Sequence, residues 1–147
     1  MNPPAATILL VEDDTAVREL VGRILEGGGF RILPASSAAQ AMLVEAGFHG
    51  PIHLLLSDIV MPGMTGPDLA SALKERRPDM RVMLMSGYPD GALLLLNYGW
   101  HFIAKPFMPQ VLLGKVRDIL ASAEQAQGTD QFDTRKSAAA PVEEKVN

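Results

Sequence analysis

The chain has 147 residues, of which 48% are apolar and 20% charged, so one globular domain with a buried core is the simplest organisation. A formal net charge of −4 indicates neither a nucleic-acid surface nor a polybasic membrane surface, and the absence of cysteine excludes disulfides and cysteine-based zinc sites. The N-terminus lacks the basic region of a signal peptide and no apolar run approaches the roughly 18 residues that span a bilayer, so we expect a cytoplasmic domain.

Short apolar runs alternate with amphipathic stretches in the first third of the chain. The run TILLV, Thr7–Val11, predicts a strand, and the helical spacing after it predicts a helix that ends at Gly27–Gly29. A second, weaker strand is expected over Phe30–Ala35. The S-x-x-Q pattern of a capping box at Ser37–Gln40 then opens a helix that runs to about Gly47.

The same alternation continues through the rest of the chain. Three further apolar runs predict strands: His53–Asp58, Arg81–Ser86 and His101–Ala104. One helix is expected to open at Gly66–Asp68 and to end before Pro78, and another opens at Pro109. Between the last two strands, the breaker-rich loop Gly87–Gly91 precedes the apolar run Leu93–Leu96, for which we expect a short helix or a core segment.

Five strands that alternate with helices, several of them continuous apolar runs, predict a parallel sheet with helices on both faces. We expect this domain to span residues 6–123. The composition changes after Ser122, where the sequence becomes polar and rich in glutamine and alanine. We predict that residues 124–147 form a disordered tail, with a helical extension or a docking segment as the alternative.

Polar side chains follow four of the predicted strands. The first strand ends in Glu12–Asp14, the third in Asp58, the fourth in Ser86, and the fifth precedes Lys105. In an open parallel sheet, ligands bind beyond the carboxyl ends of the strands. Clustered carboxylates suit Mg²⁺, while a lysine and a hydroxyl suit a phosphoryl group. The pattern therefore predicts a phosphoryl-transfer site with Asp58 as the candidate nucleophile.

Four ordered segments carry a family resemblance: LLVEDD, LLLSDIVMPGMTG, VMLMSG and FIAKPF. Together they make the chain, from about Ala6 to Ala121, resemble the receiver domain of two-component response regulators. The resemblance implies a flavodoxin-like, doubly wound fold with strand order 2-1-3-4-5. The MSGYPD-like form of the fourth segment is close to receivers of hybrid sensor histidine kinases.

The resemblance implies that Asp58 accepts a phosphoryl group from a phosphohistidine and forms an acyl phosphate. Glu12 and Asp13 would bind Mg²⁺, with Mn²⁺ as a substitute, together with Asp58 and the backbone carbonyl of Val60. Asp14, one residue further on, is interpreted as an acid at a helix N-terminus instead. The three histidines lack the spacing of a metal site and are interpreted as surface or strand-end residues.

The resemblance also implies that Ser86 bonds the phosphoryl group, that Lys105 pairs with it, and that Phe102 is the aromatic switch residue. The family usually has tyrosine at the switch, so a signal from Phe102 would lack a hydroxyl. Residues expected to shape the loops of the site are Met61, Pro62, Gly63 and Gly66 after the acceptor, and Pro106, often cis in the family, after the lysine.

The expected activity is that of a phosphoacceptor signalling domain, not an enzyme, unless the chain is a fragment of a hybrid histidine kinase. The expected partners are a sensor histidine kinase or a histidine phosphotransfer protein, and a downstream protein on the face of the fourth helix, fifth strand and last helix. Neither nucleic acid nor membrane is expected as a partner. We expect a monomer or weak dimer, either as a stand-alone regulator or as part of a hybrid kinase.

Two other functions stay open at this point. A Mg²⁺-dependent phosphatase or phosphotransferase would also use an aspartyl nucleophile, but it commonly has a second aspartate two residues on, where this chain has Val60. A degenerate receiver would act only as a binding module. In the receiver family that this chain resembles, the positions of Val60 and Tyr88 influence attack of water on the acyl phosphate. With bulky or apolar side chains at both positions, we predict slow self-dephosphorylation.

Overall fold

The computed structural model describes residues 5–87 and 99–129, in two compact units that comprise residues 1–116 and 117–147. The elements in chain order are β1 (Thr7–Val11), α1 (Thr15–Gly27), β2 (Arg31–Ala35), α2 (Ala38–Gly47), β3 (Leu54–Asp58), α3 (Gly66–Arg76), β4 (Arg81–Ser86), β5 (His101–Ala104) and α5 (Pro109–Thr129). Tyr88 and the expected helical run Leu93–Leu96 lie outside the described residues.

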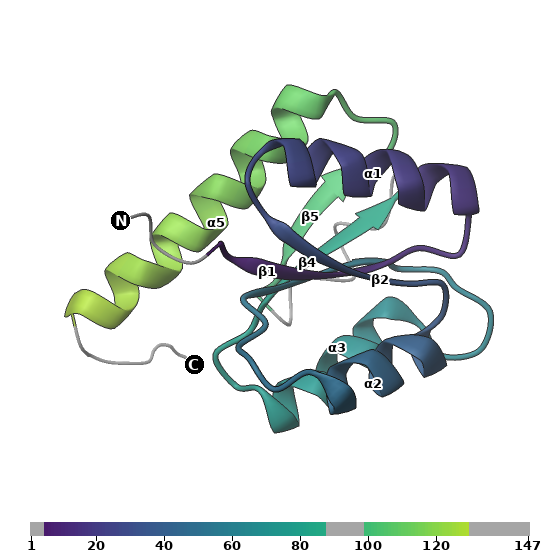
Figure 1. Cartoon of the computed structure of the whole chain (residues 1–147), viewed down its shortest axis with the longest axis horizontal. Helices are drawn as coiled ribbons and strands as arrows, with labels where there is room; N and C mark the ends of the chain where they lie inside the picture. Colours follow the sequence, from purple (N-terminus) through teal and green to yellow (C-terminus); the bar gives the residue numbers. More distant parts are fainter. Residues whose placement is uncertain (1–4, 88–98, 130–147) are drawn as a thin grey trace. The chain divides into compact units, whose positions relative to one another are not determined.

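The five strands form one parallel sheet in the order β2-β1-β3-β4-β5. Helix α1 lies on one face of this sheet, and α2 and α3 lie on the other (Figure 1). The predicted fold, a doubly wound sheet with order 2-1-3-4-5, is therefore confirmed. Pro34 lies in β2, an edge strand, where a missing backbone donor is tolerated.

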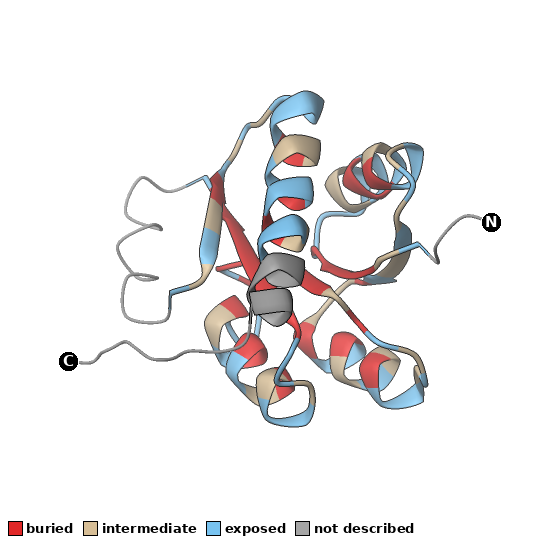
Figure 2. Ribbon diagram, turned by 90° about the vertical axis from the view of Figure 1, so that its left-hand side faces the viewer, coloured by how far each residue is buried: buried red, intermediate tan, exposed pale blue. Residues whose placement is uncertain are grey.

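The strands form the centre of the core because their side chains are buried on both faces. Every residue of β1 and β3 is buried, as Figure 2 shows for the central strands. Alternate residues such as Leu9, Leu55 and Leu84 join one apolar cluster with Ala41 of α2 and Leu69 of α3. Continuous apolar runs therefore predict these strands correctly, since a strand covered on both sides has no polar face.

Helix starts follow the capping residues closely. The Ser37 hydroxyl accepts a hydrogen bond from the Gln40 backbone N–H at 3.0 Å, as a capping box predicts. The Gln40 side chain, however, accepts from the backbone N–H of Ser36 at 2.5 Å instead of that of Ser37. At α3, Thr65 caps the helix by accepting from the Asp68 N–H at 3.2 Å.

Helix α5 begins at Pro109, as predicted, and continues to Thr129. It therefore includes residues 124–129, for which we predicted disorder. The structure of these six residues is instead the helical extension that we gave as the alternative. Alanine, glutamate and glutamine in this segment are strong helix formers. The domain limits and the disorder of residues 130–147 stay predictions, since that tail lies outside the described residues. Among the described helices, none is both long and apolar enough to cross a membrane.

Candidate functional site

The carboxyl ends of the strands bring together side chains that are far apart in the sequence. Glu12 directly follows β1 and Asp58 ends β3, and the side chains of both are buried. Ser86, also buried, ends β4, and its carbonyl oxygen accepts a hydrogen bond from the Lys105 backbone N–H at 2.9 Å. Ser86 and Lys105 are therefore neighbours at this edge of the sheet.

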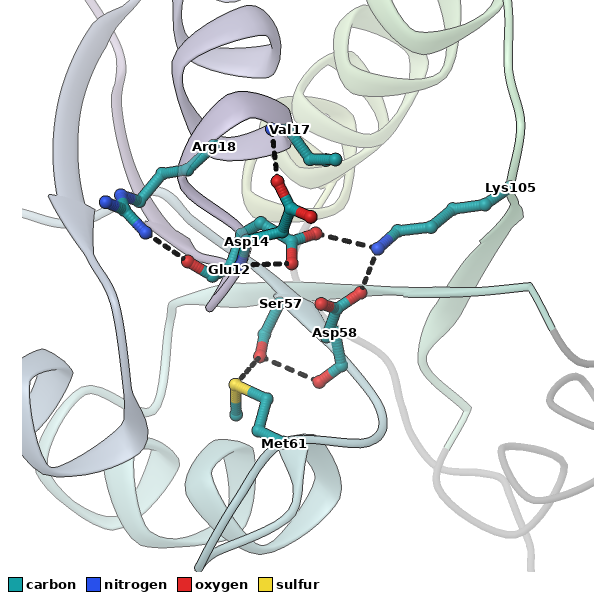
Figure 3. Close-up of polar contacts among 8 residues, drawn as sticks. All are labelled: Glu12, Asp14, Val17, Arg18, Ser57, Asp58, Met61 and Lys105. Carbon is teal, nitrogen blue, oxygen red and sulfur yellow. Dashed lines mark hydrogen bonds and ion pairs between the residues drawn. The ribbon is translucent and has the colours of Figure 1, made fainter.

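The ammonium group of Lys105 lies between two carboxylates (Figure 3). Its Nζ lies 2.7 Å from Oε1 of Glu12 and 2.6 Å from Oδ1 of Asp58. Short charge-assisted contacts of this kind are the strong class of hydrogen bond. One lysine thus holds both buried acids, although it is 93 residues from Glu12 in the chain.

Further contacts fix the orientation of Glu12. The Asp14 backbone N–H donates to Oε2 of Glu12 at 3.1 Å, and the Arg18 guanidinium donates to the Glu12 carbonyl oxygen at 2.7 Å. Asp14 itself caps α1, because its side chain accepts from the Val17 N–H at 3.0 Å. Asp14 is thus a helix-capping acid, as predicted, while the contact of Arg18 is one that sequence reasoning did not identify.

Glu12, Asp58 and Lys105 shift one another's pKa values. Burial, then hydrogen bonding with Glu12 and its charge, raises the pKa of Asp58 to about 7. Burial alone would raise the pKa of Glu12 too, but hydrogen bonds with Asp58, Lys105 and the Asp14 backbone bring it below its usual value. Burial opposes the charge on Lys105, yet the two carboxylates outweigh it and raise the pKa of the lysine.

Glu12, Asp13 and Asp58 form an acidic cluster whose candidate ligand oxygens all lie within 4.8 Å of one another. Asp13 is exposed, whereas the other two are buried. Three carboxylates against one lysine leave an excess of negative charge at this edge of the sheet. Hard oxygen donors so arranged fit a divalent cation such as Mg²⁺.

The loop after β3 shapes the surroundings of Asp58. A methyl group on Gly66 would collide with the carbonyl oxygen of Asp58, and the Gly66 N–H donates to the Ile59 carbonyl at 2.8 Å. Gly63 has a positive φ of 83°, which glycine adopts without strain. The side chain of Val60 is 61% exposed. Of the other predicted loop residues, Met61 is buried and Pro62 is exposed.

On the other side of the site, the Lys105–Pro106 peptide bond is cis, and Phe102 is partly buried against the core cluster. A cleft of about 570 Å³ adjoins Lys105, between Val17–Val21 of α1 and the Pro106–Phe107 segment. Leu20, one of its lining residues, is 54% exposed. An apolar surface therefore lies next to the acidic cluster.

Comparison with known proteins agrees with this geometry. The family model for the response regulator receiver domain matches residues 8–117. The chain belongs to the response regulator receiver family. The match runs from the second residue of β1 into the first half of α5, so the resemblance predicted from four short segments extends over nearly all of the sheet and the helices between its strands.

Similar proteins include both short and long members of the family. The chain is 33% identical over 79% of its length to the response regulator receiver protein CpdR of Brucella abortus, covering 98% of it. It is 34% identical over 79% of its length to the sensor kinase CckA of the same organism, but spans only 13% of that kinase. It spans 26% of the hydrogenase transcriptional regulatory protein HoxA of Cupriavidus necator, at 33% identity over 87% of its own length.

Solved structures show the same fold. The receiver domain of the hybrid histidine kinase CckA is 33% identical, with a TM-score of 0.69 over 78% of this chain and 99% of that one. A CheY-like receiver domain protein from Methanospirillum hungatei is 31% identical, with a TM-score of 0.74 over 82% of this chain and 98% of that one.

Proposed function

We propose that this receiver domain is a phosphoacceptor and that Asp58 is the residue phosphorylated. The observation that supports this most directly is the Lys105 ammonium held 2.6 Å from Oδ1 of Asp58, at the sheet edge where Glu12 and Asp13 also gather. A carboxylate oxygen of Asp58 attacks the phosphorus of a phosphohistidine. The P–N bond breaks, a P–O bond forms, and the imidazole leaves as an acyl phosphate is made.

The cation we propose for this reaction is Mg²⁺, with Mn²⁺ as a substitute. Glu12, Asp13, Asp58 and the backbone carbonyl of Val60 would hold it, and the donor set of the acidic cluster fits a hard divalent ion. When bound, the cation offsets negative charge on the phosphoryl oxygens. Glu12 and Asp13 contribute their charge to holding it, while Asp58 keeps one oxygen for the nucleophilic attack.

Ser86 and Lys105 are the residues we propose to receive the phosphoryl group. The backbone contact between them places both at the same end of β4 and β5. Lys105 would exchange part of its pairing with Asp58 for a phosphoryl oxygen, and the Ser86 hydroxyl would donate to another. Phe102, two residues from the end of β5 and packed on the core, would then change position as the switch, without a hydroxyl to bond.

The phosphodonor we propose is a sensor histidine kinase or a histidine phosphotransfer protein. The apolar cleft beside Lys105 offers such a donor a contact surface next to the acceptor. A downstream protein would bind the face that includes β5 and the start of α5; the fourth helix of this predicted face lies outside the described residues. The exposed Val60 side chain is consistent with slow self-dephosphorylation, because it can obstruct an attacking water.

The test is the intact mass of the protein after incubation with Mg²⁺ and acetyl phosphate. We expect one added phosphoryl group in the wild type and in Asp14→Asn, and none in Asp58→Asn or with a chelator. Asp14→Asn is the matched control because asparagine also caps a helix. Absence of the adduct with acetyl phosphate and with a phosphorylated histidine kinase would favour a binding-only receiver. Steady release of phosphate would favour a phosphatase.

A further inference from the structure

A second group of charges lies at the opposite ends of the strands from Asp58. Arg81 is the first residue of β4 and His101 is the first residue of β5. His101 is in register with Met83. Because alternate residues of a strand share a face, Arg81, Met83 and His101 project from the same face of the sheet.

Arg81 is the most unusual member of this group. Its backbone N–H donates to the His53 carbonyl oxygen at 2.9 Å, which fixes the start of β4. Its side-chain Nε is buried and has no hydrogen-bond partner among the described residues. A buried donor without an acceptor is costly. The Nε of Arg81 is therefore a donor that the described part of the chain does not use.

Two lysines add to the positive charge. Lys74 of α3 donates to the carbonyl oxygens of Pro78 at 2.7 Å and Met80 at 2.8 Å, so its ammonium is held beside the start of β4. Burial and then the charge of Arg81 lower the pKa of Lys74, while Asp79 acts in the opposite direction. Burial, then Arg81 and Lys115, lower the pKa of His101. The ring of His101 thus lies within the field of two cations.

These four residues, Lys74, Arg81, His101 and Lys115, are the basic cluster. They come from α3, β4, β5 and α5. The register of β4 and β5 brings Arg81 near His101, the Lys74 ammonium is bonded to the Met80 carbonyl oxygen next to Arg81, and the charge of Lys115 acts on His101. The charge of Asp79 acts on Lys74 and offsets part of the positive charge of the cluster. Uncompensated like charges repel one another, and binding of an anion would remove that repulsion and satisfy the Arg81 donors.

We propose that the basic cluster binds a phosphate-class oxyanion, with Arg81 and His101, which project from the same face of the sheet, as its ligands and Lys115 as a further positive charge. A guanidinium offers a planar pair of donors that matches two oxygens of such an anion, and an ammonium adds a point charge. The anion is either inorganic phosphate or the phosphate group of a small phosphomonoester. This site is separate from Asp58 and does not depend on the proposed phosphoacceptor role.

The experiment follows the ring signals of His101 by NMR, assigned by comparison with His101→Gln, during titration with inorganic phosphate or glycerol 3-phosphate. Mg²⁺ is left out and ionic strength is kept constant with sodium chloride. We expect saturable shifts of the His101 signals. Arg81→Gln and Lys115→Gln should each weaken binding at least fivefold, and Lys115 is exposed, so its replacement leaves the fold intact.

One variant controls for binding elsewhere. Arg23→Gln removes an exposed arginine from α1 and should retain wild-type phosphate affinity at His101. Shifts that do not saturate, or that survive unchanged in both Arg81→Gln and Lys115→Gln, would overturn the proposal. Tighter binding of glycerol 3-phosphate than of phosphate would identify a phosphomonoester as the ligand class, and equal or weaker binding would identify free phosphate.

Discussion

Glu12 and Glu45 are both buried carboxylates paired with a cation, yet they are in very different surroundings. Glu45 lies on α2 and pairs with Arg77, which follows α3, with Nε 2.8 Å from Oε2. The same guanidinium donates to the carbonyl oxygens of Gly50 at 2.7 Å and Phe48 at 2.7 Å. Arg77 thus ties α2, α3 and the segment between α2 and β3 together, with its donors satisfied.

Around Glu12 the acids outnumber the cations, whereas around Glu45 the cations outnumber the acid. One ammonium, that of Lys105, serves both Glu12 and Asp58, with Asp13 near them. The Glu45 pair has a second cation, Arg76, 3.5 Å from its other oxygen, whereas the Glu12 group has more acids than bases. A buried carboxylate whose charge is offset by cations is costly to leave without them, whereas a group with excess negative charge is suited to attract a further cation.

The largest expected effect concerns the pairing of Glu45 with Arg77. Arg77→Ala leaves Glu45 buried without its main partner and should lower the free energy of unfolding by about 3 kcal/mol. Arg76→Ala is the matched control: its side chain is 52% exposed, so its loss should cost less than about 1 kcal/mol. Urea unfolding of both variants measures the difference. Equal effects would mean that the Arg77 contacts are not what stabilises Glu45.

The next effect tests the group around Glu12. Lys105→Gln removes the shared cation from Glu12 and Asp58 and should destabilise the protein by about 2 kcal/mol without Mg²⁺. Mg²⁺ should restore stability more in this variant than in the wild type, because the cation replaces the lost charge. Thermal unfolding with and without Mg²⁺ measures the loss of stability in the variant and how far the cation restores it. If the stability of the variant does not change with Mg²⁺, that would argue against a cation site at these acids.

A smaller effect concerns the backbone beside Asp58. Gly66→Ala forces a methyl group against the Asp58 carbonyl oxygen and should cost about 1.5 kcal/mol, because main-chain atoms cannot rotate away. Gly47→Ala, in α2 with open space around it, should change stability by less than about 0.5 kcal/mol. Urea unfolding compares the two. No loss in Gly66→Ala would show that the β3–α3 loop adjusts freely.

The smallest effect has the opposite sign. Asp58→Asn removes one carboxylate from the acidic cluster and, without Mg²⁺, should raise the free energy of unfolding by about 1 kcal/mol, as expected where stability is given up for function. Glu75→Gln, an exposed acid on α3, should change it little. Destabilisation by Asp58→Asn in urea would instead mean that its pairing with Lys105 outweighs the repulsion between the acids.

Much of the fold could be predicted from local sequence, because a strand buried on both faces is a continuous apolar run. Thr7–Val11, Arg81–Ser86 and His101–Ala104 were predicted with the bounds that the structure has. The end of α5 was not, since a polar, alanine-rich segment is compatible with both helix and coil. The acids of the site, Ser86 and Lys105 were predicted because each lies at or just after the end of a strand, and their roles stay predictions for the experiments above.

The sequence by itself determined the order of strands and helices, the four segments typical of receivers, and the acids at the strand ends, because these depend on local periodicity and short motifs. Only the tertiary structure decided which cation pairs with which acid. The Lys105 bridge and the Arg77 contacts to Glu45 each join segments far apart in the chain. The burial of the Arg81 Nε without a hydrogen-bond partner among the described residues likewise follows from packing. Such pairings depend on strand register and helix packing, which no local pattern contains.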